Sequence, residues 1–220
     1  MSRMLSFTPE VYLSLFEQYN RAIWPAQFPA YCLGIIALLL AFRPFPQRDR
    51  IIGALLAAAW LWTGVAYHFL YFTQINFVAP VFAALFVLQG LLFTGLLALR
   101  GEVTFRFHAD LFGWTGLAFA LFAIVGYPFL EWFSGHGWPR SAVFGLTPAA
   151  TTIFTWGMLL LVQGRTPLRL TIIPLTWSLI GGAMAWLLSL PEEASLPITG
   201  IAAFALIVWK NRLAAHTEKQ

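Results

Sequence analysis

A small group of polar side chains in this 220-residue chain could do chemistry within otherwise apolar sequence. His68 follows Tyr67 near the end of one long apolar segment, and Tyr127 and Glu131 lie near the end of another. Their i,i+4 spacing places Tyr127 and Glu131 on one helix face. Imidazole, carboxylate and phenol groups at one level could bind a ligand or exchange protons at about pH 6–7. These four residues are the first candidates for a functional site.

Further polar residues are predicted to lie at the same level. Asn76 lies in the short connection after the His68 segment. Glu17, Asn20 and Arg21 belong to the opening segment, where Glu17 and Arg21 form an i,i+4 pair. The complete predicted ligand-binding set is His68, Tyr67, Glu131, Tyr127, Asn76, Glu17, Asn20 and Arg21.

Several of these polar residues also have a purely structural interpretation. His68 could be an interfacial histidine bonded to a backbone carbonyl or to Glu131. Thr152 could bond the carbonyl that Pro148 leaves free one turn earlier. Gln89 is expected to bond a neighbouring helix, as lone membrane glutamines do. Binding and structural roles therefore stay open for this layer.

Catalytic, metal and cofactor sites are not predicted. The sequence contains no nucleophile-elbow, phosphate-loop, zinc-protease or dinucleotide motif. His68, Glu131 and His136 could supply three metal ligands, but their spacing matches no metal-binding pattern. The only cysteine, Cys32, excludes an internal disulfide and a cysteine-pair metal site. An enzymatic activity is therefore not the leading expectation.

The composition predicts the elements that carry these residues. Hydrophobic residues make up 60% of the chain, charged residues only 10%, and the mean hydropathy is +0.75. Soluble domains carry about 25% charged residues, and here the apolar residues fall in long blocks, so the sequence predicts a polytopic membrane protein. The net charge is +4, but no basic run interleaves with aromatics, and a nucleic-acid partner is not expected.

Seven segments are apolar and long enough to cross about 30 Å of hydrocarbon at about 1.5 Å per residue. The predicted transmembrane helices are 25–42, 51–72, 77–99, 111–132, 142–162, 168–190 and 194–209. Their connections are too short for a soluble domain, so the predicted fold is an all-α bundle over residues 25–209. Residues 210–220 would form a cytoplasmic tail.

The distribution of basic residues predicts the orientation of this bundle. The side with most lysine and arginine carries ten of the thirteen: Arg43, Arg48, Arg50, Arg100, Arg106, Arg165, Arg169, Lys210, Arg212 and Lys219. The opposite side carries Arg3, Arg21 and Arg140. Because basic loops stay in the cytoplasm, the N-terminus is predicted outside and the C-terminus inside.

Residues 1–24 are predicted to form an amphipathic helix on the outer membrane surface. Thr8 can cap its N-terminus, and Tyr12, Phe16 and Tyr19 fall on one face. This helix could be an anchor in the membrane surface or a lid over an outward-facing cavity.

Three stretches of the chain carry a family resemblance. They are FTPEVYLSLFEQYNRAIWPAQ at 7–27, AWLWTGVAYH at 59–68 and TTIFT at 151–155. With them, nearly the whole chain resembles an uncharacterised family of bacterial multi-pass inner-membrane proteins. That family has a Cys-Pro pair where this chain has Ala149 and Ala150, which argues against thiol chemistry. The resemblance implies a bacterial inner-membrane location and no known activity.

Together these observations predict an integral inner-membrane protein whose outward-facing polar site binds or transports a small molecule. The expected partners are membrane lipid and that small molecule, with no cofactor or metal. One alternative is an accessory or scaffold subunit of a membrane complex, which a flat apolar flank without a cavity would favour. Another is a membrane-embedded enzyme, which a tight histidine–carboxylate pair beside a lipid-facing slot would favour.

Overall fold

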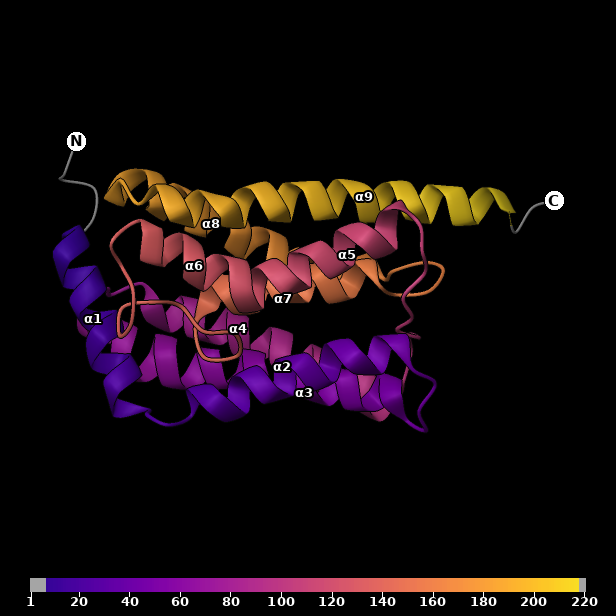
Figure 1. Cartoon of the computed structure of the whole chain (residues 1–220), viewed down its shortest axis with the longest axis horizontal. Coiled ribbons are helices and arrows are strands. Elements are labelled where there is room, and N and C mark those ends of the chain that lie inside the picture. The colour runs from indigo at the N-terminus through magenta and orange to yellow at the C-terminus, as the bar shows by residue number, and fades with distance from the viewer. Residues whose placement is uncertain (1–6, 218–220) are drawn as a thin grey trace.

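The computed structural model describes residues 7–217 as a bundle of helical rods with one helix, α1, lying across an end (Figure 1). The helices are α1 (Pro9–Ala22), α2 (Gln27–Phe42), α3 (Arg48–Trp62), α4 (Ala79–Phe93), α5 (Leu111–Leu121), α6 (Tyr127–Phe133), α7 (Pro148–Leu160), α8 (Ile172–Leu188) and α9 (Ser195–Thr217). Within 7–217 no strand forms, which agrees with the all-α prediction. Residues 1–6 and 218–220, parts of the predicted first helix and tail, lie outside the described residues.

Short π-helical and 3-10 segments extend several helices into longer rods. They are η1 (Thr63–Tyr71) and η2 (Phe72–Gln74) after α3, η3 (Thr94–Leu99) after α4, η4 (Phe122–Gly126) between α5 and α6, η5 (Leu168–Leu170) before α8 and η6 (Pro191–Ala194) before α9. The π-helical segment η1 contains Tyr67 and His68, and η4 ends directly before Tyr127. Since π-turns occur frequently at functional sites, this placement draws attention to the three side chains.

The predicted number of seven transmembrane helices is wrong. Five rods are long and apolar enough to cross a membrane: 48–74, 79–99, 111–133, 168–188 and 191–216. A sixth is added only if α1 and α2, which meet at an angle of 89°, are counted together as one broken span. The predicted span 142–162 fails because its helix, α7, has only 13 residues and is about 20 Å long.

Helix α7 lies inside the bundle, packed against α5, α8 and α9. Every residue from Ser141 to Val162 is buried. A Cβ atom added to Gly157 of α7 would lie 2.6 Å from the Gly116 carbonyl oxygen of α5, so only glycine permits this approach. Because surrounding protein encloses α7, neither this short helix nor the irregular chain before it exposes backbone N–H and C=O groups to lipid.

The bundle has two different ends (Figure 1). The α1 end comprises α1, the connection between η2 and α4, residues 134–147, and η6. The opposite end, called here the C-terminal end, comprises residues 43–47, 100–110 and 161–171 together with the last turns of α9. Most of the segment predicted to be a tail belongs to the helix, since α9 continues through Lys210 to Thr217.

Candidate functional site

Helix α1 docks on the bundle through its aromatic face. The Thr8 side chain accepts a hydrogen bond from the Val11 N–H at 3.4 Å and caps the helix, as the sequence predicts. Tyr19 is fully buried, and its hydroxyl donates to the Leu146 carbonyl at 2.8 Å. The same hydroxyl oxygen accepts a hydrogen bond from Trp62 Nε1 at 2.9 Å. These contacts fix α1 across the end of the bundle.

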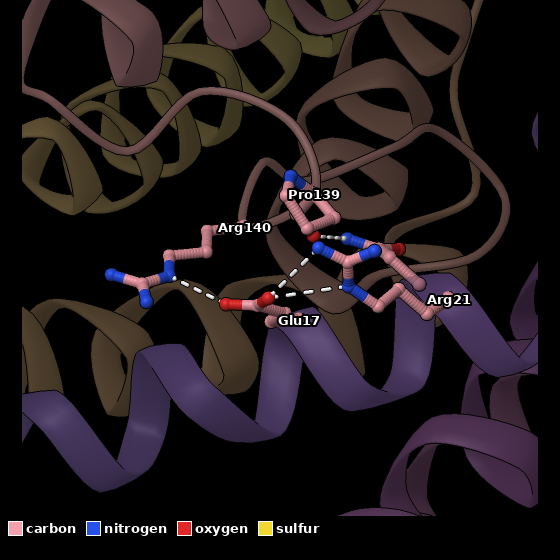
Figure 2. Close-up of polar contacts among 5 residues, drawn as sticks. Glu17, Arg21, Pro139 and Arg140 are labelled. Atoms are coloured by element: carbon pink, nitrogen blue, oxygen red, sulfur yellow. Dashed lines mark hydrogen bonds and ion pairs between the residues drawn. The ribbon is translucent and has the colours of Figure 1, made fainter.

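The opposite face of α1 carries a surface ion-pair network (Figure 2). Glu17 accepts hydrogen bonds from Arg140 Nε at 3.0 Å and from Arg21 Nη2 at 3.1 Å. Hydrogen bonding to Arg140, and then to Arg21, lowers the pKa of the Glu17 carboxyl below its ordinary value of 4.5. Glu17 and Arg21 therefore hold the helix and its neighbouring loop, and they do not face the interior.

Asn20, another predicted site residue, is a structural anchor. Its buried side-chain amide donates to the Pro139 carbonyl at 2.7 Å and to the Ser141 carbonyl at 2.9 Å. Figure 2 shows Pro139 above α1, and this proline belongs to the loop of residues 134–147. The backbone carbonyl of Asn20 accepts a hydrogen bond from Gln27 Nε2 at 2.9 Å. Asn20 thus joins α1, α2 and that loop.

Side chains from the neighbouring helices satisfy the backbone of residues 134–147 where it turns into the bundle. Glu131 Oε2 accepts a hydrogen bond from the Ala142 N–H at 2.6 Å, and Thr151 Oγ1 accepts one from the Gly145 N–H at 2.9 Å. Gly145 has a φ of +77°, in the left-handed region that favours glycine. Glu131 is thus committed in part to holding this buried loop.

Under α1 lies a cavity of about 20 Å³, which is room for one group the size of a water molecule. Its polar lining includes Tyr12, Trp177 and Glu193, from α1, α8 and η6. Glu193 is only 9% exposed. Its neighbour Glu192 pairs with His136 Nδ1 at 2.7 Å, whereas Glu193 has no ion pair among the residues described.

Tyrosine hydroxyls surround Glu193. Tyr67 and Tyr127 both neighbour this carboxylate, and the hydroxyls of Tyr127 and Tyr12 lie within hydrogen-bonding reach of it. Burial, followed by the charge of Glu193, raises the pKa of the Tyr12 hydroxyl on α1. Glu131 also lies within electrostatic range of Glu193. The result is a cluster of oxygen atoms at the α1 end, which we call the Glu193 site: Tyr12, Tyr67, Tyr127, Glu131 and Glu193.

His68 lies beside this site in an aromatic cage. Its ring centre lies 4.6 Å from that of Phe86 and 4.9 Å from that of Trp177. Neither imidazole nitrogen has a hydrogen-bond partner in the described part of the chain, so no bond to Glu131 or to a carbonyl forms there. Trp177 also lines the cavity, and its indole N–H is likewise unpartnered. His68 therefore reaches the Glu193 site only through neighbouring rings.

The remaining polar residues have local structural roles. Asn76 Oδ1 accepts a hydrogen bond from the Val78 N–H at 2.9 Å and shapes the turn into α4. Gln89 Nε2 donates to the Leu170 carbonyl at 3.1 Å, the expected bond to a neighbouring segment. The Thr152 hydroxyl donates at 2.8 Å to the carbonyl of Pro148 itself, and not to a carbonyl that Pro148 leaves free. These side chains stabilise packing and turns, and none of these three hydrogen bonds involves Glu193.

The structure thus divides the predicted set of residues. It brings Tyr67, Tyr127 and Glu131 together and sets Glu17, Arg21, Asn20 and Asn76 apart in structural contacts. The sequence analysis missed Glu193 and Tyr12. The available signal was the adjacent pair Glu192–Glu193 in a three-residue break between apolar segments, where the short connection leaves little chain to carry a carboxylate out to water.

The donor set of the Glu193 site does not suit a transition metal. Within residues 7–217, no three histidine, cysteine or acidic side chains are placed to hold a metal ion together. Carboxylate and phenol oxygens are hard ligands, which favour hard cations. Of the two carboxylates in the site, only that of Glu193 lines the cavity, where it supplies a single negative charge.

A family model described as "Family of unknown function (DUF6064)" matches residues 9–218. No curated protein and no solved structure matches the chain.

Proposed function

Since the chain belongs to the DUF6064 family, whose function is unknown, we propose a function from its own geometry: it is an integral membrane protein that binds a small monovalent cation at its α1 end. Exposed large apolar side chains support a lipid environment, because soluble monomers rarely expose apolar surface on this scale. They occur on most rods and include Phe28, Leu39, Phe69, Leu91, Trp186 and Ile201.

The observation that carries this proposal is the buried, unpaired carboxylate of Glu193. A carboxylate enclosed by protein is stable only when a proton, a cation or a set of hydrogen bonds compensates its charge. Glu192 has His136 as its partner at 2.7 Å, but Glu193 has no basic side chain in that role among the residues described. The adjoining cavity provides the space for a cation beside it.

The size of this cavity selects the class of cation. It has room for one group the size of a water molecule, which potassium and ammonium ions match closely. The single charge of Glu193 balances a monovalent ion, and the hydroxyl of Tyr12 and the ring of Trp177 in the same wall offer an oxygen ligand and an aromatic face. Tyr67 and Tyr127 add phenol groups around the carboxylate.

In this proposal α1 covers the site and faces the outside of a bacterial inner membrane. The excess of basic residues at the C-terminal end supports that orientation. The cavity is lined by α1 and by the parts of α7, α8 and α9 nearest to it, so we propose binding at the outer surface rather than passage across the bundle.

The test is cation-dependent thermal stability of the purified protein in lipid nanodiscs. At constant ionic strength, replacing N-methylglucamine with potassium or ammonium should raise the unfolding midpoint, because a ligand that binds only the folded state stabilises it. Glu193→Gln keeps the shape of the side chain and removes its charge, so this variant should lose the rise.

Glu102→Gln provides the matched control. Glu102 is also a glutamate, but it lies at the C-terminal end, where it pairs with Arg100 at 3.6 Å. The control should keep the cation-dependent rise. The proposal is wrong if no small cation stabilises the wild-type protein, or if Glu193→Gln responds as the wild type does.

A further inference from the structure

A second hollow is lined by residues of the C-terminal end of the bundle. That end lies opposite the α1 end along the rods (Figure 1). The hollow has a volume of about 340 Å³ and lies between α9, the end of α7 and the segment that precedes α5. Its charged lining consists of Arg106, His108, Asp110 and Lys210. The proposed cation site does not use any of these residues.

Lys210 contributes a buried positive charge to the wall of this hollow. Its side chain is buried, with 8% exposure, although its position in α9 is near the end of the rod. The ammonium group donates to the Leu160 carbonyl at 3.1 Å and to the Val162 carbonyl at 2.9 Å. An ammonium group has three N–H donors, so one remains after these two bonds.

Arg106 adds a second positive charge. Its backbone N–H donates to the Leu161 carbonyl at 2.9 Å, which fixes its position against the same end of α7. Among the described residues, Arg48 pairs with Asp49 and Arg100 with Glu102, but the exposed Arg106 guanidinium has no ion pair. Its donors are therefore available to a ligand.

The single carboxylate in the wall is already engaged. Asp110 accepts a hydrogen bond from the Gly113 N–H at 2.7 Å and caps α5. Arg106 and Lys210 thus share the wall with one capping carboxylate, and at neutral pH the net charge of the lining is positive even with His108 neutral. A hollow with unpaired arginine and lysine donors suits a phosphate group, which accepts several charge-assisted hydrogen bonds at once.

We propose that this hollow binds a phosphate group, through Arg106 and the third donor of Lys210. In a membrane-spanning bundle, basic pockets between helices at the cytoplasmic surface are suited to the headgroups of anionic lipids. An anionic lipid headgroup and free phosphate share the same chemistry, and the experiment below separates these two sources.

The experiment measures binding to the full-length protein by native mass spectrometry and by thermal unfolding. One arm adds phosphatidylglycerol to protein held in neutral detergent, and the other adds inorganic phosphate. Arg106→Gln should weaken binding about tenfold, as expected when charge-assisted hydrogen bonds are lost. Lys210→Met should weaken it as well.

Two features keep this test decisive. Lys210→Met also leaves the Leu160 and Val162 carbonyls without their partner and could impair folding, whereas Arg106→Gln leaves both bonds intact. Arg212→Gln is the control, because Arg212 lies two residues after Lys210 on α9 but lines a different hollow. This variant should bind as the wild type does.

Stabilisation by phosphatidylglycerol alone supports the site and assigns it to a lipid headgroup. Stabilisation by inorganic phosphate supports the site and assigns it to the free anion. The proposal is overturned if neither compound binds, or if Arg106→Gln and Arg212→Gln weaken binding equally, since that result indicates only the general positive charge of this end.

Discussion

At the scale of single residues, two glutamates at the α1 end show how surroundings separate structural from functional carboxylates. Glu131 accepts a 2.6 Å hydrogen bond from the Ala142 N–H and holds a buried loop. Glu193 accepts no backbone N–H hydrogen bond within the described residues; it has tyrosine hydroxyls around it and lies beside a water-sized cavity. Both are buried, so burial alone does not distinguish them. Their hydrogen-bond partners do.

The anchoring role of Glu131 predicts a difference between two substitutions. Glu131→Ala removes the acceptor for the buried Ala142 N–H and should cost about 1–3 kcal/mol of stability. Glu131→Gln keeps an oxygen acceptor at the same position and should cost less. Equilibrium unfolding in detergent micelles measures both. Equal stability of the two variants would show that this hydrogen bond does not hold the loop.

The ion pairs of Glu17 predict a dependence on pH. Arg140 and Arg21 lower the pKa of the Glu17 carboxyl in the folded protein. The stability that Glu17 adds is therefore complete above its ordinary pKa of 4.5 and is lost as the pH falls below that value. The unfolding midpoint should therefore fall less steeply between about pH 5 and 3 in Glu17→Gln than in the wild type.

The two arginines provide an internal comparison for the Glu17 prediction. Arg140 has the larger effect on Glu17, so Arg140→Gln should remove more of the pH dependence than Arg21→Gln. Arg140 also joins α1 to the loop, whereas the Arg21 contact stays within α1. Identical pH profiles for the wild type and Glu17→Gln would contradict the assigned role.

Sequence patterns predicted some of these residues but could not separate residues of the site from residues with structural roles. Tyr67, Tyr127 and Glu131 could be placed at one level because helix rise fixes depth along a rod. Rotation about each rod and the packing between rods decide which side chains meet, and neither follows from spacing in uniformly apolar helices. The cage around His68 was not foreseen for this reason. Glu193 was missed because its place in a short connection suggested exposure to water, whereas the structure buries it.

At the scale of elements, α1 and α7 show where sequence patterns succeed and fail. The N-cap and the aromatic face of α1 were both predicted, because an amphipathic helix with Thr8 at its N-cap has a strong local signal. For α7, the predicted span 142–162 is longer than the helix, which begins only at Pro148. Ala142–Leu146 are apolar and read as membrane helix, yet they form a buried loop.

Close approach of α5 and α7 predicts a glycine-specific effect. A Cβ on Gly157 would lie 2.6 Å from both the Ala120 nitrogen and the Gly116 oxygen, so Gly157→Ala should force the helices apart and cost about 1–3 kcal/mol. Gly95→Ala is the control, since nothing lies within 4 Å of its added Cβ. Unfolding experiments that find equal effects would argue against a close α5–α7 contact.

At the scale of the whole molecule, a buried helix lies within a membrane-type bundle. Five rods are long and apolar enough to cross a membrane. Helices α2 and α7 are shorter, yet in both of them the chain runs between the two ends of the bundle (Figure 1). Composition predicts the membrane class, but it counts apolar length and cannot tell a helix in contact with lipid from one enclosed by protein. That limit explains the wrong number of spans.

The path of the chain predicts the topology. Residues 134–147 lie at the α1 end, and α9 finishes at the C-terminal end (Figure 1). A reporter after Gln220 should therefore behave as cytoplasmic and one inserted within Gly135–Gly137 as periplasmic. Reporters that indicate the same side would exclude this arrangement in the membrane.

The most direct test of cation binding is to locate the ion. Thallium replaces potassium and ammonium in sites of this size and gives anomalous X-ray scattering, so crystals grown with thallium should show one peak in the cavity under α1. This peak should lie beside the Glu193 carboxylate, face Tyr12 and Trp177, and disappear in Glu193→Gln. An empty cavity in the wild-type crystals, or a peak that persists in Glu193→Gln, would contradict it.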